Sequence, residues 1–125
     1  MEVWTIQLAK AKQAEKVGIP ILNTTIKCGE LTFAPTWEIV LAVKAGTITQ
    51  EQYTTSYTNL MRWSFKTNRD RWLEVANMPV VAVACMCKEG VFCHRHLLVK
   101  MFESVCNKSG IPFKLLGEWK PEAKH

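Results

Sequence analysis

The segment from residue 85 to residue 96 holds three cysteines, two histidines and one arginine, the densest set of reactive side chains in the chain. Its last part, Cys93, His94, Arg95 and His96, is predicted to form the first turn of an amphipathic helix. A helix start offers free backbone N–H groups and the positive end of the dipole, which bind anions. Arg95 adds a planar fork of donors, and either histidine can donate or shuttle a proton. We therefore expect an anionic ligand here.

Covalent chemistry by Cys93 is an alternative interpretation of the same residues. A thiol at a helix start beside arginine and histidine is more nucleophilic than a free thiol. A phosphatase-like loop, however, places a run of backbone N–H donors between its cysteine and its arginine, and Arg95 follows Cys93 by only two residues. We therefore favour a small, buried, apolar cysteine over a nucleophile at this position. In a second alternative, Arg95 is structural and pairs with a carboxylate.

A metal site is a third alternative. Cys85, Cys87 and Cys93, with either His94 or His96, would supply four ligands for zinc. The C-x-C spacing of the first two is poor for such a set, so we expect no metal and no cofactor.

Composition restricts the class of protein. The chain has 125 residues, of which 48% are hydrophobic, which is enough for one folded domain. It begins without the features of a signal peptide, and no apolar run approaches the roughly 18 to 20 residues that cross a bilayer. Five cysteines, an odd number, argue against a secreted disulfide scaffold. We expect a cytoplasmic protein with no membrane partner.

The net charge of +5 comes from lysines and arginines scattered along the sequence. We interpret most of them as a solvated surface. The alternative is that they attract an anionic partner, small or polymeric. No basic stripe with stacking aromatics is present, so nucleic acid is not an expected partner.

Periodicity and turn signals predict alternating strands and helices. Residues 80–85 are apolar on both faces, as in a central parallel strand. Thr49 and Gln52 form a capping box before a long helix, and Gly110 is placed as a helix C-cap. The expected strands are 3–8, 19–26, 80–85 and 112–116, and the expected helices are 9–16, 36–45, 50–65, 68–77 and 95–107.

This order predicts one α/β domain over residues 1–118, with a parallel sheet of about four strands flanked by helices, and a tail over 119–125. Ligands of such sheets bind beyond the carboxyl ends of the strands, where the strand order switches. The loop after Cys85, with Cys87, is expected there. Gln7, Asn23 and Thr24, at the ends of the first two strands, are expected beside it.

Four further side chains are expected to cap this edge. Tyr53 and Tyr57 share a face of the predicted helix 50–65, and Trp37 and Lys44 lie on the preceding helix. An aromatic ring would stack on a base or sugar, and Lys44 would reach a phosphate. The alternative is that the aromatic residues belong to the core.

Several motifs together resemble the DUF488 family, and most closely its short members carried by bacteriophages and prokaryotes. The resemblance spans roughly residues 3–116, and its most specific element is the Cys-His-Arg helix start. It implies a small Rossmann-like or flavodoxin-like domain, similar to nucleoside deoxyribosyltransferase-like and TIR-like proteins, which handle nucleosides and NAD-derived molecules. The motifs are LTFAPTW at 31–37, VKAGTI at 43–48, Tyr53, Tyr57, CMC at 85–87 and FCHRHLL at 92–98.

From these observations we expect a binder of a nucleotide, an ADP-ribose or a cyclic nucleotide derivative. A phage-encoded member would sequester a nucleotide immune signal in the host cytoplasm. The first alternative is an enzyme acting on a nucleoside or NAD-derived substrate, with Glu30, Glu38 or Glu89 and a histidine as acid–base groups. The second is a zinc-stabilised interaction module. A homo-oligomer is left open.

Overall fold

The computed structural model describes residues 1–86 and 93–121. Four parallel strands form one sheet in the order β2-β3-β1-β4: β1 (Glu2–Gln7), β2 (Ile21–Asn23), β3 (Val80–Cys85) and β4 (Lys114–Glu118). The predicted α/β fold with a four-stranded parallel sheet is therefore confirmed. Within the described residues, no helix is long and apolar enough to cross a membrane.

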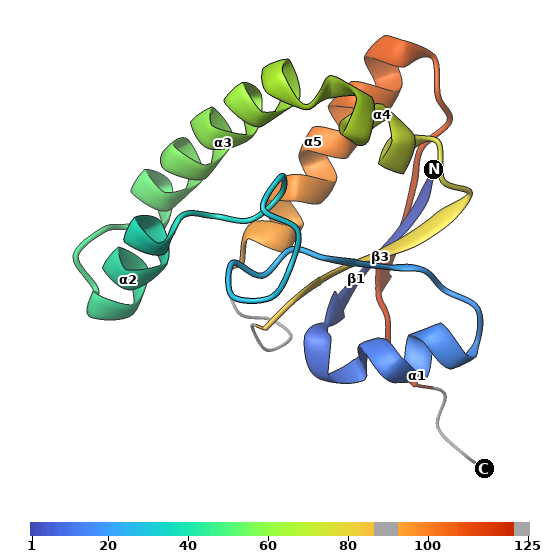
Figure 1. Cartoon of the computed structure of the whole chain (residues 1–125), viewed down its shortest axis with the longest axis horizontal. Coiled ribbons are helices and arrows are strands. Elements are labelled where there is room, and N and C mark those ends of the chain that lie inside the picture. Colours follow the sequence, from blue (N-terminus) through green and yellow to red (C-terminus); the bar gives the residue numbers. More distant parts are fainter. Residues whose placement is uncertain (87–92, 122–125) are drawn as a thin grey trace.

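The helices are distributed over both faces of this sheet (Figure 1). A short 3-10 turn, η1 (Leu8–Lys10), leads into α1 (Ala11–Lys16) on one face. The other face carries α3 (Gln50–Thr67), α4 (Arg69–Ala76) and α5 (His94–Ser109), and α2 (Trp37–Ala45) packs against α3.

Alternation along the strands explains the two layers, because successive side chains of a strand point to opposite faces. Val3, Val81 and Val83 face the large core formed with α3, α4 and α5. Ile6 and Ala84 face a smaller cluster with α1. Both faces of the central strands are thus covered, as a parallel sheet requires.

Caps explain where the helices begin and end. Thr49 Oγ1 accepts from the N–H of Gln52 at 3.0 Å, and Gln52 Oε1 accepts from the N–H of Thr49 at 2.8 Å, so the predicted capping box is confirmed. Gly110 ends α5 with a φ of 71°, a left-handed conformation that glycine adopts without strain.

Two strands differ from their predicted ranges, with consequences for the site. Strand β2 ends at Asn23 instead of residue 26, because Asn23 Oδ1 accepts from the N–H and the hydroxyl of Thr25 and turns the chain. Strand β4 runs two residues further than predicted, to Glu118, which adds an acidic side chain beside β1. Trp119 continues this pairing by donating its N–H to the carbonyl of Thr5, so ordered structure extends into the predicted tail.

Candidate functional site

The carboxyl ends of three strands meet at one edge of the sheet. Gln7, at the end of β1, pairs in register with Cys85, at the end of β3. Asn23 pairs with Ala84, and Thr24 donates both its N–H and its hydroxyl to the carbonyl of Ala84, at 2.9 and 2.8 Å. The chain leaves β1 toward β2 and leaves β3 toward β4, in opposite directions across the sheet. Gln7 and Cys85 therefore lie at the switch point between β1 and β3, and Asn23 and Thr24 lie on the other side of β3 at the same edge.

His94 joins this edge from the first turn of α5. Its Nε2 lies 2.8 Å from the hydroxyl oxygen of Thr24 and 3.0 Å from the carbonyl oxygen of the same residue. The carbonyl can only accept, and the Thr24 hydroxyl already donates to Ala84, so the hydrogen-bond network assigns the ring proton to Nε2. The other nitrogen, Nδ1, then carries a lone pair. Burial lowers the pKa of His94 to about 4, which keeps the ring neutral at pH 7.

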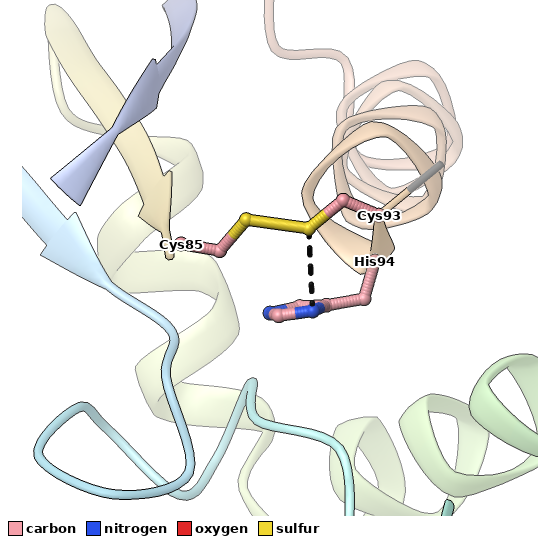
Figure 2. A group of neighbouring side chains, drawn as sticks. All are labelled: Cys85, Cys93 and His94. Carbon is pink, nitrogen blue, oxygen red and sulfur yellow. Dashed lines mark hydrogen bonds between the residues drawn. A yellow bond between two sulfur atoms is a disulfide. The ribbon is translucent and has the colours of Figure 1, made fainter. Parts of the chain in front are cut away.

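Two sulfur atoms lie beside this ring. Cys93 Sγ is 3.7 Å from His94 Nδ1, and it meets the sulfur of Cys85 across the space between β3 and α5 (Figure 2). The figure draws this sulfur pair as a disulfide, yet the two Cα atoms are 7.8 Å apart, whereas disulfides usually join Cα atoms separated by about 4.4 to 6.8 Å. The backbone spacing therefore also suits two thiols that share a ligand.

This trio revises the expectation on metal ligands. The ligand atoms of Cys85, Cys93 and His94 all lie within 4.8 Å of one another, and all three residues are buried. The objection from the C-x-C spacing does not apply to them, since the partners of Cys85 come from the start of α5. Cys87 and Glu89, both named as candidates from the sequence, lie outside the described residues. Cys28 and Cys106 are free and lie apart from the trio.

Arg95 points into the protein. Its side chain is completely buried, with Nη1 2.8 Å from Cys85 Sγ and Nη2 3.4 Å from Glu118 Oε2. Glu118 also accepts from the hydroxyl of Thr5 at 2.6 Å. The carboxylate-pairing alternative describes these contacts, and an additional role of Arg95 toward an anionic ligand stays a prediction. The extension of β4 to Glu118 is the physical reason for the pairing.

The predicted aromatic cap is only partly present. Tyr57 is buried, with its ring centroid 5.4 Å from that of His94, and Tyr53 stacks on Tyr57 at 6.2 Å. Trp37 is half exposed and Lys44 is exposed, and the described residues show no hydrogen bond or ring contact from either to the strand ends. These two side chains do not join the site because α2 packs against α3 rather than over the sheet edge.

The remaining candidates have other surroundings. His96 is exposed on α5, and its pKa is lowered, mainly by partial burial of the ring. Glu30 is held by Arg71, with Nε–Oε2 and Nη2–Oε1 distances of 2.8 and 2.7 Å. Glu38 is exposed in the first turn of α2. Within the described residues neither glutamate makes a polar contact with His94, so the acid–base set proposed from the sequence is not assembled there.

A second feature lies away from the strand ends. A groove of about 770 Å³ runs between α3 and α5 over an apolar floor that includes Phe65 and Met101. The charged residues that line it are all basic, although the sequence suggested only a scattered excess of charge. They are Arg62, Lys66, Arg69, Lys100 and Lys108.

Sequence reasoning missed two members of the site. Cys85 was considered only as a metal ligand and not as a neighbour of Arg95, because the pairing of β3 with the start of α5 is a tertiary contact. Glu118 carried no signal, since a single acid near the end of a chain is usually solvated.

Comparison with known proteins gives a family. No curated protein and no solved structure matches the chain. Residues 30–105 match the family DUF488-N3a, described as the "Active DUF488-N3 subclade". This match covers more than half of the chain and includes Cys85, Cys93, His94 and Arg95. The protein therefore belongs to the DUF488-N3a family.

Proposed function

We propose that this protein binds an anionic, nucleotide-type small molecule at the carboxyl edge of its sheet. One observation carries the proposal: the carboxyl edge of the parallel sheet, next to the switch point between β1 and β3, brings together residues from separate parts of the chain, namely Gln7, Asn23, Thr24, Cys93 and His94. Ligands of open α/β sheets bind at this place, because loops from neighbouring strands diverge there and leave a crevice.

The start of α5 supports an anionic ligand rather than a neutral one. The helix is 16 residues long, its first turn has no acidic residue, and the side chain of its N-cap residue Cys93 makes no capping hydrogen bond. The partial positive charge of the helix start is thus not offset by a carboxylate of its own first turn. The ring of Tyr57 packs beside His94 inside the core and would support His94 from behind rather than face the ligand.

The positions of the acidic residues favour binding of the ligand without its chemical conversion. An N-glycosidic reaction needs a carboxylate near the sugar, and Glu30 is engaged by Arg71 while Glu38 is exposed on α2. A phage member of the family that holds such a ligand intact would sequester a nucleotide immune signal.

A catalytic function is the second candidate, and one contact favours it. His94 Nδ1, which carries a lone pair, lies 3.7 Å from Cys93 Sγ, a pairing in which histidine accepts a thiol proton and leaves a nucleophilic thiolate. The word "active" in the family description is consistent with this candidate.

One experiment tests both candidates. The reduced protein is incubated with ADP-ribose, NAD or a cyclic nucleotide, binding is measured by calorimetry, and the ligand is recovered after denaturation and identified by mass spectrometry. Saturable binding with intact ligand supports sequestration, whereas a product formed by the wild type and lost in Cys93→Ser supports catalysis. Absence of binding to every probe contradicts the proposal.

A matched pair of variants locates the ligand. His94→Gln should weaken binding, because it removes the ring at the strand ends, while Lys66→Ala in the groove between α3 and α5 should not. The reverse result would assign the anion to the groove and overturn the proposed place.

A further inference from the structure

We propose that Cys85, Cys93 and His94 form a binding site for one thiophilic metal ion, most suitably zinc. Two sulfur atoms and one imidazole nitrogen converge from the end of β3 and the start of α5 (Figure 2). The three side chains are between 1% and 6% exposed, so water does not surround them. A cluster of two thiols and an imidazole is rare in a protein interior without a structural or chemical reason.

The orientation of His94 is the second observation that points to a metal. Its Nε2–H is directed at the carbonyl and hydroxyl oxygens of Thr24, which leaves Nδ1 as the nitrogen that faces Cys93 Sγ at 3.7 Å. Histidines that bind metals almost always donate their other N–H to a carbonyl or carboxylate, which fixes the ring and its tautomer. In this protein the carbonyl and hydroxyl oxygens of Thr24 accept that N–H.

Charge balance supports the same assignment. Two thiolates neutralise a divalent cation, and the buried guanidinium of Arg95, which donates to Cys85 Sγ at 2.8 Å, is balanced by Glu118. The whole cluster is then neutral, which avoids the cost of an uncompensated charge in the interior.

Spacing and ligand type indicate which metal. Sulfur and imidazole nitrogen suit zinc, whereas magnesium and calcium prefer oxygen. A tetrahedral zinc ion keeps its ligand atoms about 3.5 to 4 Å apart, and the Cys93–His94 pair is already at 3.7 Å. The Cα atoms of Cys85 and Cys93 are 7.8 Å apart, so in the reduced protein the two sulfurs can separate by side-chain rotation and take an ion between them. Three protein ligands leave a fourth position open to water or an anionic ligand.

The test uses Co²⁺ as a spectroscopic probe, so no nucleotide is needed. Protein stripped of metal and kept reduced under anaerobic conditions is titrated with Co²⁺ and then with Zn²⁺. We expect one equivalent of Co²⁺ to produce a thiolate-to-cobalt charge-transfer band with the intense visible bands of a four-coordinate ion. Zn²⁺ should abolish the charge-transfer band and the visible bands, since it displaces Co²⁺ by binding the same ligands more tightly.

Variants assign the signal to these residues. Cys85→Ser and Cys93→Ser should each weaken Co²⁺ binding by at least about a hundredfold. Even the loss of a residue that only hydrogen-bonds a metal ligand lowers metal affinity by about 10- to 100-fold. Cys106→Ser is the matched control, since Cys106 is a buried thiol further along α5 whose sulfur lies 4.0 Å from the sulfur of Met1. It should bind Co²⁺ as the wild type does.

A second measurement on the wild type is independent of whether the serine variants fold. With one equivalent of Zn²⁺, alkylation and peptide mass mapping should show Cys85 and Cys93 protected and the exposed Cys28 modified. A wild type without a charge-transfer band would overturn the proposal. So would undiminished binding in both serine variants, or a Cys85–Cys93 disulfide whose reduced form takes up no metal.

Discussion

Arg95 and Glu118 are paired inside the protein, with Nη2 of the arginine 3.4 Å from Oε2 of the glutamate and the arginine completely buried. The pair joins the first turn of α5 to the last strand, and Nη1 of the same guanidinium reaches Cys85 at the end of β3. One side chain thus connects three elements behind the candidate site. These contacts favour a positioning role for Arg95.

Replacing Arg95 with alanine should therefore destabilise the fold. The change leaves Glu118 without its buried counter-charge, and breaking a buried ion pair typically costs about 3 to 5 kcal/mol. Urea unfolding followed by circular dichroism measures the loss. Arg62→Ala, at an exposed position of α3, is the control and should change the free energy of unfolding by less than about 0.5 kcal/mol. An Arg95→Ala variant of normal stability that no longer binds ADP-ribose would show instead that the guanidinium serves the ligand.

Helix α3 holds the chain that follows β2 through two hydroxyls on one face. Tyr57 donates to the carbonyl of Phe33 at 2.6 Å, and Ser64, two turns later, donates to the carbonyl of Thr32 at 2.6 Å. Ser64 also accepts from the indole N–H of Trp72 at 3.2 Å. The path of the chain beside the sheet edge thus depends on these buried polar contacts.

Ser64→Ala should lower the free energy of unfolding by about 1 to 3 kcal/mol, because it leaves the Trp72 indole N–H and the Thr32 carbonyl without this partner. Ser56→Ala, on the exposed face of the same helix, should have almost no effect. Thermal unfolding of the two variants side by side measures the difference. Equal stability would mean that the Ser64 contacts contribute no net free energy.

The neutral tautomer of His94 follows from its contacts with Thr24. Long-range proton–nitrogen NMR spectra of the metal-free protein at pH 7 should show Nε2 protonated and Nδ1 unprotonated, since both Thr24 oxygens accept from Nε2. Thr24→Val removes one acceptor and should raise the population of the other tautomer, whereas Thr25→Val, whose hydroxyl bonds Asn23, should not. A spectrum with Nδ1 protonated in the wild type would contradict both the proton assignment and the metal ligand role of His94.

The sequence was sufficient for the architecture and for the edge at which the candidate residues meet. Apolar runs, caps and glycine positions are local signals, so Val80–Cys85, the Thr49 capping box and the Gly110 C-cap are found close to their predicted places. The direction of long side chains is decided by tertiary contacts instead. Arg95 points inward because β4 extends to Glu118, a residue whose position depends on pairing with β1 across more than a hundred residues of chain.

Tertiary packing, which the sequence does not reveal, also explains why Trp37 and Lys44 were assigned to the site. Both residues are therefore informative controls. Their place on the helix before the one with Tyr53 suggested a cap, but the packing of α2 against α3 leaves both exposed. If ADP-ribose binds at the strand ends, Trp37→Ala and Lys44→Ala should change its dissociation constant by no more than about twofold, the size expected for a surface change of about 0.5 kcal/mol. Calorimetry at one fixed salt concentration measures this, with His94→Gln as the variant expected to lose affinity. A tenfold loss in either α2 variant would mean that α2 closes over the sheet edge when the ligand binds.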